Sequence, residues 1–175
     1  GTEAHDYSGR SVSNAGDVNG DGLDDMVIGS DAGIGKSYVA FGKTDGTVVE
    51  LSDVTAGNGG FVINGDQPGY IGRSVSSAGD VNGDGLDDLI LGAYLASPNG
   101  ITKIGESYVV FGKSDGTNVE LADIRNGDAG FVIKGIDALD RSGVSVSNAG
   151  DVNGDGLDDL IIGAFNADPN GKYEV

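Results

Sequence analysis

Three stretches of the chain repeat a pattern of oxygen-bearing side chains that could bind a metal ion, Asp-x-Asn-x-Asp-Gly-x-x-Asp. Calcium takes about six to eight oxygen ligands, and alternate side chains converge on one ion only if the chain curls tightly. The glycine at the sixth position permits that turn, the seventh residue can offer its carbonyl, and the ninth-position Asp can close the far side through both oxygens. The sequence therefore predicts three calcium sites, with the ligands Asp17, Asn19, Asp21, Leu23 and Asp25; Asp80, Asn82, Asp84, Leu86 and Asp88; and Asp151, Asn153, Asp155, Leu157 and Asp159.

Each of these loops gathers three carboxylates that would repel one another without a cation, so we expect the metal-free loop to be strained or open. Magnesium fits less well than calcium, because it demands near-ideal octahedral geometry and usually keeps several waters. The alternative is that Asn-Gly-Asp-Gly forms only a hairpin turn with solvated acids. A turn needs only a couple of special residues, whereas five oxygen donors keep the same offsets in three copies, so the pattern favours metal binding.

An EF-hand begins with the same residues and would imply flanking helices. It requires a bidentate Glu at the twelfth position of the loop. The equivalent residues are Ile28, Leu91 and Ile162, which lie in apolar runs typical of strands. Each loop is therefore predicted to join two β-strands.

The elements that must position these loops follow from an internal repeat. The segment that begins at Ser11 returns at Ser74 and at Ser145, at spacings of 63 and 71 residues. The block Ser37–Gly42 returns at Ser107–Gly112, and a seven-residue insertion precedes the second of these blocks. Length differences confined to such places mark them as loops.

Short apolar runs in each copy are rich in β-formers and bounded by Gly, Asp and Asn, as β-strands are. The middle runs are continuous rather than alternating, which is typical of strands buried on both faces. The single turn Glu120–Ile124 is the one possible helix, too short to carry weight, so the chain is predicted to be all-β. In the second copy we predict four strands, at Arg73–Ser77, Asp88–Gly92, Glu106–Phe111 and Phe131–Lys134.

Four short strands per repeat is the composition of a β-propeller blade, whereas a β-solenoid generally has a shorter repeat. We therefore predict blades of four antiparallel strands, with the calcium loop between the first and second strands. Aromatic residues that recur with the blade are predicted to form core between blades rather than a ligand cage. They are Tyr38, Tyr108, Phe41, Phe111, Phe61 and Phe131.

These features together resemble FG-GAP repeats, the blades of the integrin α-subunit β-propeller and of many bacterial extracellular proteins. The resemblance is carried by the calcium loop, by Gly92-Ala-Tyr94 and Gly163-Ala-Phe165, and by the Phe-Gly pairs that end at Gly42 and Gly112. Copy one departs from it at Gly29-Ser-Asp31. The resemblance implies that calcium loops occupy one face and adhesive ligands the opposite face, on which the loops Ala93–Ile104 and Gly65–Tyr70 would lie.

The repeat divides the chain into two blades, residues 1–64 and 65–134, and a partial third blade, residues 135–175. About two and a half blades cannot close a ring, because closed propellers need about four to eight. We expect either a fragment of a longer propeller or an oligomer that completes a ring or fibre between chains. The edge at Val175 is predicted to be open and prone to association.

The composition excludes several classes of protein. Ten Lys and Arg against 28 Asp and Glu give a net charge of −18, which disfavours nucleic acid and anionic lipid as partners. The chain has no Cys, so disulfides and Cys-ligated metals are excluded. No apolar run is long enough to insert in a membrane. The weak calcium affinity typical of extracellular modules, with a Kd of about 10⁻⁴ to 10⁻³ M, suits a secreted or cell-surface location.

Two strings suggest an enzyme but fail on context. Gly112–Gly116 matches the G-x-S-x-G nucleophile pattern, which needs a following helix and a later His. No such helix is predicted, and the one His of the sequence, His5, lies upstream. Ile34–Ser37 resembles the end of a P-loop, but the glycine spacing is wrong and Glu106 replaces Lys36 in the second copy, so Lys36 is interpreted as a solvated residue.

We therefore expect a non-enzymatic, calcium-binding extracellular module with a structural or adhesive role, or one that binds protein or glycan. The alternatives are an accessory domain of a secreted enzyme and a self-assembling surface or fibre protein. Calcium is the expected cofactor, and the expected partners are a protein or glycan ligand or other copies of the chain.

Overall fold

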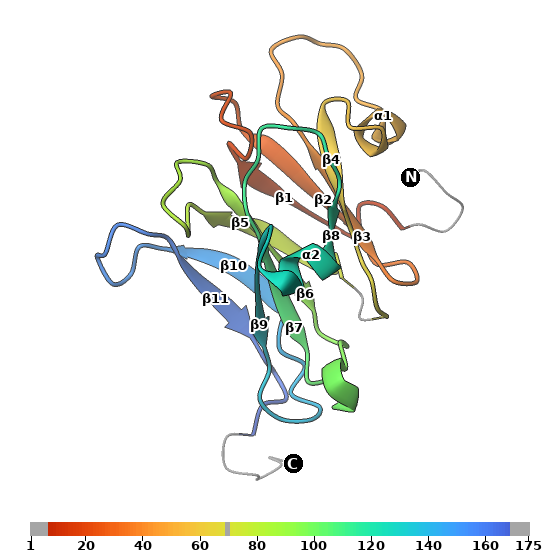
Figure 1. Ribbon diagram of the computed structural model, residues 1–175, viewed down its shortest axis with the longest axis vertical. Coiled ribbons are helices and arrows are strands. Elements are labelled where there is room, and N and C mark those ends of the chain that lie inside the picture. The colour runs from red at the N-terminus through yellow and green to blue at the C-terminus, as the bar shows by residue number, and fades with distance from the viewer. Residues whose placement is uncertain (1–6, 69–70, 169–175) are drawn as a thin grey trace.

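The computed structural model describes residues 7–68 and 71–168, which form three sheets stacked in chain order, antiparallel except for one short parallel pair (Figure 1). Blade one contains β1 (Ser11–Gly16), β2 (Asp25–Ser30), β3 (Lys36–Ala40) and β4 (Gly60–Asn64). Blade two contains β5 (Ser74–Gly79), β6 (Asp88–Ala93), β7 (Glu106–Val110) and β9 (Gly130–Lys134). The third sheet contains β10 (Ser145–Gly150) and β11 (Asp159–Gly163). The four-stranded blade is confirmed in the first two copies; the edge predicted at Val175 lies outside the described residues.

The first hairpin of every copy has the same irregularity. Antiparallel pairing shifts register where the first strand ends, at Gly16, Gly79 and Gly150. Each of these glycines has a positive φ, between +69° and +74°, which a residue with a Cβ rarely adopts. The bulge turns the chain into the acidic loop, so the glycine at the end of the first strand helps to set the direction in which the loop begins.

The core lies within and between the blades. All residues of β6 and β7 are buried, as their continuous apolar runs predicted. One hydrophobic cluster joins side chains of blades one and two, including Phe61 and Tyr108. The predicted aromatic core is thus largely confirmed, but Phe131 remains 39% exposed, because no described strand pairs with the outer edge of β9, whereas β8 of the next blade pairs with the equivalent β4.

Two short helices correct the expectation that no helix forms. They are α1 (Leu51–Thr55) and α2 (Leu121–Asn126), each in the long connection between the third and fourth strands of its blade. Val54 of α1 and Leu121 and Ile124 of α2 are buried, so tertiary packing stabilises turns too short to form alone. The two-residue strand β8 (Val119–Glu120) precedes α2 and pairs in parallel with β4, which links the two blades.

The blades are arranged as in a propeller whose ring is open. The first strands β1, β5 and β10 lie next to one another in series, and each sheet extends outward from its first strand (Figure 1). The 3₁₀ turn η1 (Pro98–Gly100) lies in the predicted insertion between β6 and β7. Neither α1 nor α2, the helices of the described part, is long and apolar enough to cross a membrane.

The second strands of blades one and two each contain a glycine where the next blade approaches. A Cβ on Gly92 would lie 2.0 Å from the carbonyl oxygen of Gly143, whereas one on Gly163 would have no heavy atom nearer than 3.6 Å. We therefore expect Gly92→Ala to destabilise the chain by about 3 kcal/mol, the cost of overpacking against backbone. Gly163→Ala, the matched control, should change the free energy of urea unfolding by less than about 1 kcal/mol. Equal effects would contradict close blade packing at Gly92.

Candidate metal centre

The three acidic loops lie at the same end of the stacked sheets (Figure 1). Residues 17–24 connect β1 to β2, residues 80–87 connect β5 to β6, and residues 151–158 connect β10 to β11. The residues equivalent to the EF-hand's closing Glu lie inside β2, β6 and β11, so the loop joins strands as predicted. The repeat thus presents the same donor set three times, in neighbouring blades.

Each loop is curled by hydrogen bonds from its backbone to its own side chains. In the first loop the carboxylate of Asp17 accepts N–H bonds from Gly20, Asp21 and Gly22 at 2.8, 3.0 and 2.9 Å. Asn19 Oδ1 accepts from the Asp21 N–H at 2.8 Å. The carboxylates of Asp80 and Asp151 accept the equivalent three bonds in the other loops. The donors at the first, third and fifth positions are therefore held in one tight turn.

The ninth-position carboxylates turn toward the sheet. Asp25 and Asp88 are buried, with 4% and 0% of their surface exposed. Asp88 accepts backbone N–H bonds from Val81 at 3.1 Å and from Gly112 at 2.8 Å, one on each oxygen. Burial raises the pKa of Asp88 to about 6, against the opposing effect of these two N–H bonds, and nearby carboxylates raise it further. Burial raises the pKa of Asp25 in the same way.

Asparagine side chains bring the donors of each loop within reach of one another. Asn19 Nδ2 lies 3.0 Å from Asp21 Oδ2, and in the third loop Asn153 Nδ2 lies 3.4 Å from Asp159 Oδ1. Without a cation, this amide donation offsets part of the repulsion between carboxylates. Within residues 7–68 and 71–168, however, no three acidic or histidine side chains form a group that could hold a metal ion. The three carboxylates predicted for each loop therefore do not by themselves converge into a metal-binding group, and a ligand set would also need the amide and the seventh-residue carbonyl.

The chemistry of that set fits a hard cation. It consists of carboxylate, amide and carbonyl oxygens, which are the ligands of calcium, and contains no nitrogen or sulfur ligand. The expectation that the ninth-position Asp binds through both oxygens meets a constraint in the first two loops. Each oxygen of Asp25 already accepts one N–H bond, from Val18 and from Gly42, so a metal would use the remaining lone pairs.

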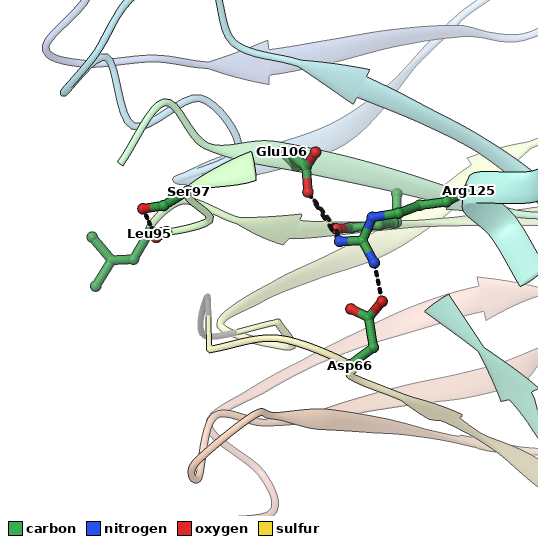
Figure 2. A network of polar contacts seen from close by, with 6 residues as sticks. Asp66, Leu95, Ser97, Glu106 and Arg125 are labelled. Atoms are coloured by element: carbon green, nitrogen blue, oxygen red, sulfur yellow. Dashed lines mark hydrogen bonds and ion pairs between the residues drawn. The ribbon is translucent and has the colours of Figure 1, made fainter. Parts of the chain in front are cut away.

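A second polar cluster lies away from the metal loops and was not predicted. Arg125 of α2 reaches between Glu106, the first residue of β7, and Asp66 of the connection from blade one (Figure 2). Glu106 is 1% exposed; its Oε2 accepts from Tyr108 Oη at 2.5 Å and from Arg125 Nη2 at 3.2 Å. Burial, followed by the bond to Glu106, raises the pKa of Tyr108, so its hydroxyl remains a donor.

A paired difference between the repeats could have indicated this cluster. Where blade two has Glu106 and Arg125, blade one has Lys36 and Thr55. Lys36, interpreted as a solvated residue, begins β3 and is half-buried, and its Nζ lies 5.5 Å from the ring centre of Tyr38. In blade one a strand lysine thus lies over the ring of Tyr38, whereas in blade two a helix arginine lies over the ring of the equivalent Tyr108.

The connections from second to third strand lie at the end opposite the metal loops (Figure 1). They comprise residues 31–35 in blade one and the longer residues 94–105 in blade two. This placement agrees with the face that the resemblance implied for the loop Ala93–Ile104. Of the other loop expected there, Gly65–Tyr70, the last two residues lie outside the described residues, as does His5.

The fold and the loops together define a β-propeller repeat with acidic loops between the first two strands of each blade. The FG-GAP repeat model matches residues 8–49, 71–110 and 142–174, and the chain belongs to this family.

Among curated relatives, integrin alpha pat-2 of Caenorhabditis elegans is 33% identical over 94% of the chain, and integrin alpha-5 of Xenopus laevis is 29% identical over 99%. Integrin alpha-IIb of Mus musculus is 28% identical over the whole chain. The chain spans only 14%, 16% and 16% of the lengths of these three relatives.

Proposed function

We propose that this chain is a calcium-stabilised, extracellular β-propeller module with an adhesive or structural role. The observation that carries the proposal is the loop geometry, in which the first carboxylate of each copy accepts N–H bonds from the fourth and sixth residues and so curls the repeated oxygen-rich turn. The names of the integrin alpha relatives support an adhesion-type role at the cell surface. The proposed units are residues 1–64, 65–134 and 135–175.

Calcium would supply charge neutralisation rather than chemistry. Three dications would offset six of the 18 net negative charges. They would do so within the three loops, where neighbouring carboxylates repel one another. The proposed ligands in the second loop are the side chains of Asp80, Asn82, Asp84 and Asp88 and the carbonyl of Leu86, with equivalent residues in the other two. Holding the loop rigid would fix the ends of the two strands that it joins.

Metal counting tests the sites one at a time. We expect Asp84→Ala to lower the number of bound calcium ions by one, because it removes the fifth-position donor of the second loop only. Native mass spectrometry in millimolar calcium counts the ions directly. Asp128→Ala is the control, since Asp128 is an exposed acid outside the loops. An unchanged count in Asp84→Ala would contradict the assignment.

An adhesive role is tested at the end opposite the metal loops. There the residue 94–105 connection is the longest variable segment and is suited to binding a protein or glycan. A glycan and matrix-protein array probed with the intact chain should show binding that is lost when residues 95–103 are replaced by a short Gly-Ser linker. Binding that survives this replacement would favour another surface.

The accessory-domain alternative predicts enzymatic activity elsewhere in a longer protein. The self-assembly alternative predicts a native mass above that of one chain.

A further inference from the structure

The loops contain an acidic residue for which the metal pattern has no use. It is the eighth-position aspartate, present as Asp24, Asp87 and Asp158. Asp24 is exposed, whereas Asp87 and Asp158 are half-buried. The difference arises because each of the latter two reaches across a blade junction to the preceding metal loop.

At both junctions the contact is a reciprocal pair of hydrogen bonds. The Asp17 N–H donates to Asp87 Oδ2 at 2.8 Å, and the Asp87 N–H donates to the Asp17 carbonyl at 3.1 Å. The Asp80 N–H donates to Asp158 Oδ2 at 3.1 Å, and the Asp158 N–H donates to the Asp80 carbonyl at 3.2 Å. We refer to these two pairs, Asp17–Asp87 and Asp80–Asp158, as the inter-blade clasps.

Glycine makes room for each clasp. A Cβ on Gly16 would lie 2.1 Å from Asp87 Oδ2, and one on Gly79 would lie 2.0 Å from Asp158 Oδ2. Gly150 occupies the same place in the third copy, where no further blade is described, and a Cβ there would meet nothing within 4 Å. The recurring Ala-Gly-Asp therefore combines a bulge glycine with a contact to the next blade.

Each clasp acts on the residue that organises the preceding loop. The clasp at Asp17 holds its main-chain N–H and carbonyl, while the same residue's carboxylate accepts three N–H bonds from the loop. The adjacent carbonyl of Val18 accepts a bond from the Lys113 N–H of blade two at 2.8 Å. Blade two thus fixes the start of the first loop from outside it.

We propose that Asp87 and Asp158 are positioning residues of the metal loop one blade earlier, and that the clasps couple calcium binding in one loop to packing against the next blade. The inference rests on the proposed calcium function. By thermodynamic reciprocity, calcium in the first loop also strengthens the packing of blade two on blade one.

A chain with a single working loop tests the coupling. Asp84→Ala with Asp155→Ala leaves only the first loop able to bind, and calorimetric titration with calcium measures its Kd. Adding Asp87→Ala should weaken binding about tenfold or more, as loss of an outer-shell partner does for other metal sites. Asp87→Asn keeps an oxygen that accepts the Asp17 N–H and should restore the Kd to within about threefold.

Asp158→Ala is the matched control, because it releases the other clasp and should leave the first loop's Kd unchanged. Hydrogen exchange at the Asp17 amide should speed up in Asp87→Ala but not in Asp158→Ala, with or without calcium. This measurement reports on the Asp17–Asp87 clasp independently of metal binding. An Asp87→Ala Kd equal to that of the starting variant, or an equal loss in Asp158→Ala, would overturn the coupling. No calcium binding by the starting variant would instead overturn the proposed function.

Discussion

Removing calcium is expected to lower the unfolding temperature of this chain by roughly 10 °C or more. For a Kd of about 10⁻⁴ to 10⁻³ M, 10 mM calcium stabilises the folded state by about 1.4 to 2.7 kcal/mol per site. Three sites give about 4 to 8 kcal/mol, and each kcal/mol shifts the unfolding temperature of a chain of this size by about 2 to 4 °C. Differential scanning calorimetry with calcium and with excess chelator measures the shift.

Two controls separate specific binding from screening of the net charge of −18. Sodium chloride at matched ionic strength weakens repulsion everywhere on the surface and should give only part of the shift. A variant in which Asp21, Asp84 and Asp155 are all replaced by Asn should lose most of the calcium-specific part. The same unfolding temperature in millimolar calcium and in chelator would contradict calcium as the stabilising ion.

The strands were predictable because their signals are local and repeated. Each predicted strand of blade two agrees with the structure to within two residues, and the turn residues that bound it are visible in the sequence. The helices α1 and α2 were not predictable in this way. They contain five and six residues, and their stability comes from buried Val54, Leu121 and Ile124 rather than from helix propensity.

The donor residues of the metal loops were predictable by type, but their surroundings were not. The N–H of Gly112 that faces Asp88 lies 24 residues along the chain, and the N–H of Asp17 that faces Asp87 lies 70 residues away. Both contacts depend on how strands and blades pack, and a spacing rule does not contain that information. The recurring Asp-Asp doublet was visible in the sequence, yet its two members face different partners.

Loss of the Arg125 side chain is expected to have the largest effect of any substitution outside the metal loops and glycines. Arg125→Met would leave the Glu106 side chain, which is 1% exposed, without its cationic partner. Its Oε1 has no hydrogen-bond partner within the described residues, so the Tyr108 hydroxyl, which donates to Oε2, would be left to offset the cost of burial. Breaking a buried ion pair from one side costs about 3 to 5 kcal/mol, a large part of the stability of an ordinary domain. Urea unfolding followed by circular dichroism measures the loss.

Blade one provides the control for this prediction, because it has Lys36 and Thr55 at the positions of Glu106 and Arg125. Thr55→Met should cost less than about 1 kcal/mol, since no ion pair depends on Thr55.

The double variant Glu106→Lys with Arg125→Thr transfers the blade-one pair to blade two and should recover more than half of the stability lost in Arg125→Thr. A loss below about 1 kcal/mol in Arg125→Met would contradict a stabilising ion pair between Glu106 and Arg125. If stability recovers in the double variant, the two positions act as a pair, because substitutions at independent sites would add their losses.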